Sequence, residues 1–317
     1  METYKRIKLR YLVFAILIAL AIYILFFLIS DLDRILIAIS NFSYLLWIQV
    51  VALSVLSYVL RFIRWKSFLD NSKVNIPLIN NILIYYSAFS LTLTPGKAGE
   101  TVRSVFLKSY NVNYSQSISM FISERFLDLL AVTLLASLFI YLYFTYLFYV
   151  LIIFMAIISF YAFINLSCLT GVLKRFKFWN IGEYIINIVD STSSFLIMRR
   201  LPFLIASSMI AWASQGFSLY IILREMGFNL SVWQCIPLYS LSILIGAASF
   251  VPGGLGVTEV AITTLLMSAG LGREDAFLAA IISRGSTLWL AVLIGIIAMS
   301  FLSVTDKLIV FESNTEN

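Results

Sequence analysis

The chain has 317 residues, of which 61% are apolar and 12% are charged, and its formal net charge is +6. Soluble domains carry about 25% charged residues, so this composition and a mean hydropathy of +0.98 exclude a soluble globular protein and indicate a polytopic α-helical membrane protein. The absence of histidine and the presence of only two cysteines argue against zinc or haem ligation, Ser–His catalysis and a disulfide framework. We therefore expect no metal site and no cofactor.

Apolar runs of span length predict six membrane helices. They cover residues 10–29, 44–62, 118–142, 146–166, 201–223 and 276–304. The first run follows a basic N-terminus but exceeds the 7–15 residues of a signal-peptide core, so we expect a retained span. Residues 180–198 predict an interfacial helix on the cytoplasmic side, with a buried connector as the alternative. The expected organisation is one transmembrane domain, 1–317.

Two further apolar stretches, 80–94 and 233–250, are short and end at Pro-Gly motifs. The first would rise roughly 21 Å as a helix, which is less than the ~30 Å hydrocarbon core. Each short stretch followed by a second short segment therefore predicts a pair of half-helices that enter and leave the membrane on the same face. Irregular backbone at such depth is tolerated where it is buried in protein or lines a wet cavity.

The two Pro-Gly motifs form an internal repeat. Pro95-Gly96-x-x-Gly99 corresponds to Pro252-Gly253-x-x-Gly256, and the glutamates Glu100 and Glu259 follow them. An arginine of the next span, Arg125 or Arg284, comes after each motif, and a span ending in Arg64 or Arg224 comes before it. The pattern predicts a duplication, with a first repeat in 1–166 and a second in 167–317. The expected fold is an all-α bundle of two inverted repeats, each with a re-entrant broken-helix hairpin.

The positions of the basic residues favour re-entrance over crossing. If the N-terminus is cytoplasmic, six of the 22 basic residues lie outside the cytoplasmic segments. Arg34, Arg224 and Arg273 lie on the outer side, and Lys97, Arg125 and Arg284 lie at membrane depth. The other sixteen, with Arg61, Arg64 and Arg103 among them, lie in cytoplasmic segments, as the positive-inside rule requires. Both termini are therefore expected in the cytoplasm. Because the cations lie between spans, we expect no nucleic-acid partner.

Charged residues near the two tips are the candidate site. A restarting helix presents free N–H groups and a positive dipole end to an anion. The candidates for substrate binding and translocation are Lys97, Glu100, Arg125, Glu259 and Arg284, with Pro95, Gly96, Gly99, Pro252, Gly253 and Gly256 forming the tips. Arg103, Glu124 and Asp128 are weaker candidates, because we expect Arg103 and Asp128 nearer the cytoplasmic interface.

Two interpretations of these charges stay open. In the first, the glutamates pair with Arg125 and Arg284 or with their own half-helix ends, and only hold the hairpins together. In the second, the arginines and free N–H groups bind a phosphate while the glutamates gate it or carry a proton. Lys97 favours the second, because the other motif has Gly254 at that position and a structural brace would occur in both repeats.

The sequences "TPGKAGETVR" and "SERFLDLLAV", then "VPGGLGVTEVAITTLLMSAGL" and "ISRGSTLWLAV", resemble the flippase-like family of lysylphosphatidylglycerol synthase transmembrane regions, and more narrowly its stand-alone branch. In bifunctional members the membrane region is held to move aminoacylated phospholipid between leaflets. The resemblance implies lipid translocation without naming the lipid, and it places the family's hairpins on the two Pro-Gly motifs.

The expected function is a flippase that moves a phosphate-bearing phospholipid or polyprenyl-phosphate-linked lipid across the cell membrane. Two alternatives are a scaffold or accessory subunit of a glycolipid pathway, and an integral-membrane transferase with Glu100, Glu124 or Asp128 as a base. The expected partners are membrane lipids with anionic headgroups. A homo-oligomer and glycolipid-pathway enzymes are further alternatives.

Overall fold

The computed structural model describes residues 40, 42–143, 188, 191–192, 194–196 and 200–315, with side chains for all of these except 140–143 and 303–315. The predicted spans at 10–29 and 146–166, and most of the predicted interfacial helix at 180–198, lie outside this part of the chain. The described part is helical throughout, as the composition predicts.

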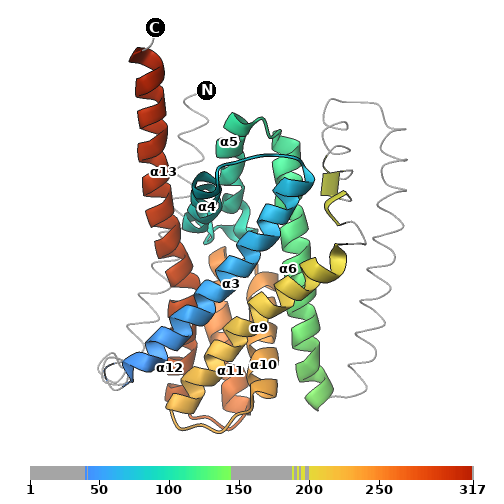
Figure 1. Cartoon of the computed structure of the whole chain (residues 1–317). Helices are drawn as coiled ribbons and strands as arrows, with labels where there is room; N and C mark the ends of the chain where they lie inside the picture. Colours follow the sequence, from blue (N-terminus) through green and yellow to red (C-terminus); the bar gives the residue numbers. More distant parts are fainter. Residues whose placement is uncertain are drawn as a thin grey trace.

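Three long helices cross one another in the middle of the molecule. α3 (Tyr44–Asn71) begins where the hydroxyl of Ser43 accepts a hydrogen bond from the backbone N–H of Leu46, and it packs along α9 (Leu201–Glu225). α6 (Tyr114–Tyr143) packs against α9 and α10 (Figure 1). α3 extends nine residues beyond the predicted span of 44–62, while the predicted spans 118–142 and 201–223 match α6 and α9 closely.

The last predicted span, 276–304, is part of a longer helical rod. α12 (Arg273–Arg284) continues through a π-helical turn (Gly285–Trp289) into α13 (Leu290–Thr315). In the described part of the chain, three helical segments are long and apolar enough to cross a membrane: Tyr44–Asn71, Leu201–Glu225 and Arg273–Leu302. α6 has the length, but its first half carries Glu124, Arg125 and Asp128.

The first Pro-Gly motif breaks a helix, as its sequence predicts. α4 (Leu78–Ser87) tightens into a 3₁₀ turn (Ala88–Leu91), and the chain then turns at Pro95 into a second 3₁₀ segment, η2 (Pro95–Val102). α5 (Arg103–Leu107) and a final turn (Lys108–Tyr110) complete this half. Gly96 and Lys97 are both left-handed, with φ of 58° and 56°. Glycine is required at Gly99, where a Cβ would lie 2.7 Å from the Leu91 carbonyl oxygen.

The second motif produces a similar break. α10 (Val232–Ala248) ends before a short 3₁₀ turn, η4 (Pro252–Gly254), and α11 (Val257–Ser268) follows. Gly253 and Gly254 are left-handed, with φ of 61° and 66°, which repeats the conformation of Gly96 and Lys97. Phe250 is also left-handed, with φ of 54°, which is strained backbone for a bulky residue. The two breaks therefore share the left-handed pair after the proline, but the first continues as a 3₁₀ helix whereas the second has an extended Leu255 before α11.

The two breaks meet in the centre of the molecule. The α4–α5 pair lies in one half and the α10–α11 pair in the other, and η2 contacts η4 between them (Figure 1). A Cβ on Gly253 would lie 2.9 Å from Cδ2 of Leu93, so the first break packs directly on the second. Leu93 also packs with Leu255, Leu288 and Trp289 in a small apolar cluster.

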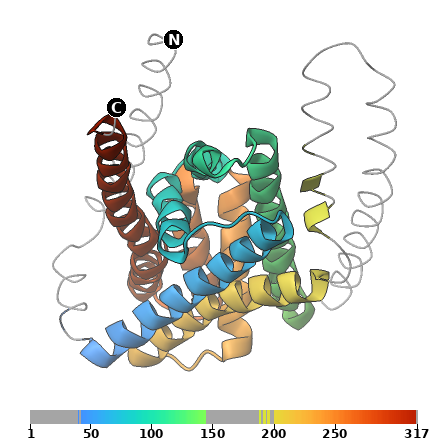
Figure 2. The same ribbon diagram turned by 45° about the horizontal axis from the view of Figure 1, so that its top comes forward.

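The helices around the breaks form two larger apolar cores. One joins α6, α9, α10, α11 and α12, and the other packs α3 against the α4–α5 half and α13. Figure 2 shows the α4–α5 half enclosed between α13, α3 and α6. Close backbone packing links α13 to the first break, because a Cβ on Gly295 would lie 2.1 Å from the backbone nitrogen of Ser90.

Candidate functional site

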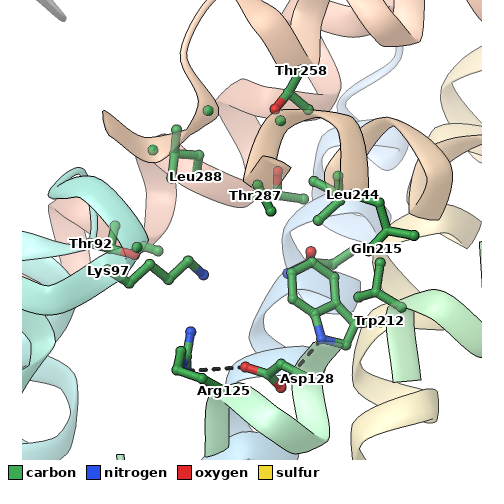
Figure 3. Close-up of a pocket in the computed structure, with 18 of the residues that line it drawn as sticks. Thr92, Lys97, Arg125, Asp128, Trp212, Gln215, Leu244, Thr258, Thr287 and Leu288 are labelled. Carbon is green, nitrogen blue, oxygen red and sulfur yellow. Dashed lines mark hydrogen bonds and ion pairs between the residues drawn. The ribbon is translucent and has the colours of Figure 1, made fainter. Parts of the chain in front are cut away.

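A cavity of about 490 Å³ lies where the two breaks meet. Its wall is built by α3, both breaks, α6, α9, α10 and the rod formed by α12 and α13. Six charged side chains line it: the cations Arg61, Lys97, Arg125 and Arg284, and the carboxylates Glu100 and Asp128. Apolar side chains such as Leu244 and Leu288 cover much of the remaining wall (Figure 3).

The first break and α6 contribute a chain of ion pairs. Glu100 is 3% exposed, accepts a hydrogen bond of 2.9 Å from the hydroxyl of Thr92, and lies 3.6 Å from Nη2 of Arg125. The same Nη2 lies 3.0 Å from Oδ2 of Asp128, one turn further along α6. Arg125 is thus shared between two carboxylates, and its side chain stays 23% exposed. This arginine has room to exchange one partner for a ligand.

Asp128 connects α6 to α3 and α9. Its Oδ1 accepts hydrogen bonds from Nη1 of Arg64 at 2.8 Å and from the indole N–H of Trp212 at 3.3 Å. Arg64 is fully buried, and a buried arginine without this carboxylate would be very costly. The hydrogen bond from Trp212 to Asp128 also fixes the indole in the cavity wall (Figure 3).

The second break is held more tightly than the first. Nε of Arg284 donates to Oε1 of Glu259 at 2.9 Å, and its Nη2 donates to the carbonyl oxygen of Gly253 at 2.7 Å. Glu259 lies behind the wall and is 1% exposed. In the other half, Arg125 forms ion pairs with Glu100 and Asp128, and among the described residues it makes no hydrogen bond to a tip carbonyl. The Arg284–Glu259 pair therefore has the geometry of the bracing interpretation.

Lys97 reaches from the first tip into the cavity (Figure 3). Its Nζ lies 5.7 Å from the ring centre of Trp212, and no carboxylate lies within ion-pair distance among the described residues. The left-handed backbone at this position favours glycine, which the other tip has at Gly254. Lysine occupies this position although the left-handed backbone favours glycine, which indicates a functional role for its side chain.

The tip residues divide between lining and support. Gly96 and Gly253 line the cavity, whereas Pro95, Gly99, Pro252 and Gly256 shape the turns around it.

Arg103 and Glu124 form a buried ion pair away from the cavity, with the guanidinium of Arg103 stacked 4.2 Å over Trp65. Arg103 is 1% exposed and Asp128 is 5% exposed, and their expected position nearer the cytoplasmic interface stays a prediction. Each is held by a buried partner instead of water.

Sequence reasoning missed Arg61, Arg64 and Trp212. It assigned Arg61 and Arg64 to a cytoplasmic segment, but their side chains are 6% and 0% exposed. The sequence did indicate the importance of Arg61, because this residue falls inside the predicted span 44–62 and a charge within a span marks a functional or paired position. The hydroxyl of Tyr239 and the amide of Gln215, joined at 3.2 Å, also line the cavity and carried no such signal. Arg224 is exposed, so it is not an equivalent of Arg64.

Long apolar helices around a charged internal cavity define a polytopic helical integral membrane protein with an enclosed polar site. The chain belongs to the family described as lysylphosphatidylglycerol synthase TM region, whose model matches residues 13–295. The resemblance inferred from the paired motifs is thereby confirmed.

Relatives of the chain include archaeal membrane proteins and a bacterial enzyme. A UPF0104 membrane protein of Pyrococcus horikoshii is 26% identical over 286 residues, which covers 78% of this chain and 85% of that protein. One from Methanocaldococcus jannaschii is 27% identical over 221 residues, covering 66% and 92%. A phosphatidylglycerol lysyltransferase of Staphylococcus epidermidis is 27% identical over 94 residues, but the match covers 30% of this chain and 11% of that enzyme.

Proposed function

We propose that this protein moves a lipid with a phosphate-bearing headgroup between the leaflets of the cell membrane. The observation that carries the proposal is the cavity between the two breaks, with four cations and two carboxylates in a wall that is otherwise largely apolar. Such a cavity suits an anionic headgroup, while the acyl or prenyl chains stay beside the apolar helices. The lysyltransferase relative is named for phosphatidylglycerol, which is an anionic phospholipid.

The proposal includes a topology in which both broken helices are re-entrant hairpins of opposite orientation. The segments Leu78–Leu91 and Val232–Ala248 are shorter than the ~20 residues that a spanning helix needs. Their tips contact each other, and the two hairpins extend into opposite halves of the molecule (Figure 1). With both termini in the cytoplasm, this arrangement would place the cavity near the midplane, where transporters of this kind bind their substrates.

The unequal bracing of the tips supports alternating access through the first hairpin. Arg284 ties the second tip to α12 through Gly253 and Glu259, whereas Arg125 lies 3.6 Å from Glu100. Exchange of Glu100 for a headgroup phosphate at Arg125 would release the first tip from α6. We therefore propose that the first hairpin moves and that the second is the fixed wall.

A transferase reaction has less support than transport. A general base must lie within reach of the proton that it removes. Asp128 is engaged by Arg64 and Arg125, Glu124 by Arg103, and Glu100 by Arg125 and the hydroxyl of Thr92. These carboxylates are neutralised by neighbouring groups, which suits a binding site better than a base.

Reconstitution in liposomes tests the proposal. Tail-labelled phosphatidylglycerol would be compared with a neutral glycosyl diacylglycerol, and a membrane-impermeant quencher would report the outer-leaflet fraction. We expect the protein to accelerate loss of the inner-leaflet signal for the phosphate-bearing lipid. Folded protein that accelerates neither this lipid nor a labelled phosphatidic acid or polyprenyl phosphate above protein-free vesicles would refute it. Arg224→Gln, at an exposed position outside the cavity, is the matched control.

A further inference from the structure

Arg61 is a buried cation in the cavity wall that forms no ion pair with the described residues. It lies on α3 and is 6% exposed, and in the described part of the chain no carboxylate approaches it within ion-pair distance. Its Nε and Nη2 are buried and lack hydrogen-bond partners among the described residues. Arg64, one turn later on the same helix, is instead paired with Asp128. A buried guanidinium with unmet donors calls for an anion that the described residues do not supply.

The indole of Trp212 places Arg61 and Lys97 beside the same space. The guanidinium carbon of Arg61 lies 4.2 Å from the ring centre, and Nζ of Lys97 lies 5.7 Å from it. The ring is oriented by its hydrogen bond to Asp128. Arg61 comes from α3 and Lys97 from the first tip, so two cations that form no ion pair in the described part of the chain converge from separate elements. They repel each other until an anion lies between them.

We propose that Arg61 and Lys97 together bind the headgroup phosphate, and that this pair favours a phosphate monoester. This inference rests on the proposed function and names the substrate class of the same cavity. Nε and Nη2 lie along one edge of a guanidinium, and that edge binds two oxygens of one phosphate. Lysine adds a point charge. Two unpaired cations match the charge of about −1.5 to −2 of a monoester better than the single charge of a diester.

A purely structural role does not account for this pair. A buried brace needs a partner, as Arg64 and Arg103 have in Asp128 and Glu124. Among the described residues Arg61 stacks on the face of Trp212 without a carboxylate partner, and Lys97 occupies a left-handed position that glycine would fill at lower conformational cost. Both features become explicable when a phosphate completes the site.

Tryptophan fluorescence of the purified full-length protein provides the test. The probe is dioctanoyl phosphatidic acid, compared with dioctanoyl phosphatidylglycerol, dioctanoylglycerol and inorganic phosphate. We expect phosphatidic acid to bind at least about tenfold more tightly than phosphatidylglycerol, and dioctanoylglycerol not to bind. Trp212→Phe should remove the emission change. Inorganic phosphate that binds as tightly as phosphatidic acid would overturn the lipid assignment, and equal binding of the two phospholipids would overturn the monoester preference.

Variants then locate the phosphate. Arg61→Gln should weaken binding of phosphatidic acid by roughly 10- to 100-fold. Arg61→Lys should recover part of the loss, and the exposed control Arg224→Gln should bind as the unmodified protein does. Unchanged affinity in a folded Arg61→Gln protein overturns the inference.

If Arg61→Gln does not fold, comparison of the unmodified protein with Trp212→Phe still decides. Phosphatidic acid that binds to it without a Trp212-dependent emission change would then overturn the inference. Binding that depends on Arg61, in a protein that transports no lipid, would refute the proposed function and leave this site intact. Lipid transport by Arg61→Gln with unchanged binding of phosphatidic acid would refute this binding site and leave the proposed function intact.

Discussion

Replacing Lys97 by glycine separates the charge of this side chain from the demands of its backbone. Lys97 has φ of 56°, and the corresponding Gly254 has φ of 66°, so glycine fits the first tip without moving it. The left-handed conformation costs a non-glycine residue roughly 1–2 kcal/mol. Glycine loses about 0.5–1 kcal/mol through greater freedom in the unfolded chain. The free energy of unfolding should therefore stay within about 1 kcal/mol of the original value.

The effect on lipid transport should be much larger. A cation about 5 Å from a phosphate charge contributes roughly 3 kcal/mol at an effective dielectric constant of about 20. Lys97 is half-buried, so solvent reduces this value, and we expect substrate affinity to fall by about 10- to 100-fold. Transport at subsaturating lipid should fall by a similar factor.

Liposome transport and thermal unfolding in detergent measure the two effects on one preparation. Lys97→Met is the matched control, since it removes the charge but keeps a side chain in the left-handed backbone. Lys97→Met should lose transport as Lys97→Gly does, but the left-handed backbone at position 97 should stay strained. Lys97→Arg keeps the charge and should retain most transport. A Lys97→Gly protein that is stable and transports at the original rate would refute a role for this charge.

Further predictions concern the second hairpin. Gly246→Ala would place a Cβ 2.0 Å from the hydroxyl oxygen of Thr258, and should lower the free energy of unfolding by about 1–3 kcal/mol; an unchanged unfolding temperature would contradict this close packing of α10 on α11. Arg284→Gln should destabilise by about 3–5 kcal/mol because Glu259 loses its partner. Adding Glu259→Gln should recover part of that stability, and strictly additive losses in denaturation of the double variant would argue against direct pairing.

Sequence patterns located the broken helices because their causes are local. Proline lacks an N–H donor and glycine admits a left-handed backbone, so Pro95-Gly96 and Pro252-Gly253 had to interrupt any helix that reached them. Long apolar runs likewise predicted α3 and α9 to within a few residues at their starts. The re-entrant, inverted topology depends on where the membrane lies, and it stays a prediction.

The partners of the buried charges were beyond local reasoning. Arg64 and Asp128 are 64 residues apart, and Trp212 is 84 residues from the same carboxylate. Only the crossing of α3, α6 and α9 brings these residues together. Because the partner of Arg64 is distant in sequence, Arg61 and Arg64 were interpreted as basic residues of a cytoplasmic segment. Glu259 and Arg284 were predicted together because both follow the second Pro-Gly motif in the order in which Glu100 and Arg125 follow the first, each at a spacing two residues longer.

The ion pair between Arg64 of α3 and Asp128 of α6 has a consequence for biosynthesis. α6 carries Glu124, Arg125 and Asp128 within its first half, and placing three charges at the bilayer centre costs roughly 8–10 kcal/mol for an isolated helix. α3 is synthesised earlier and brings Arg64, the partner of Asp128. α6 should therefore partition into lipid poorly by itself and should leave the translocon only after docking on α3. The residues that shape the cavity would then also set the order in which the helices enter the membrane.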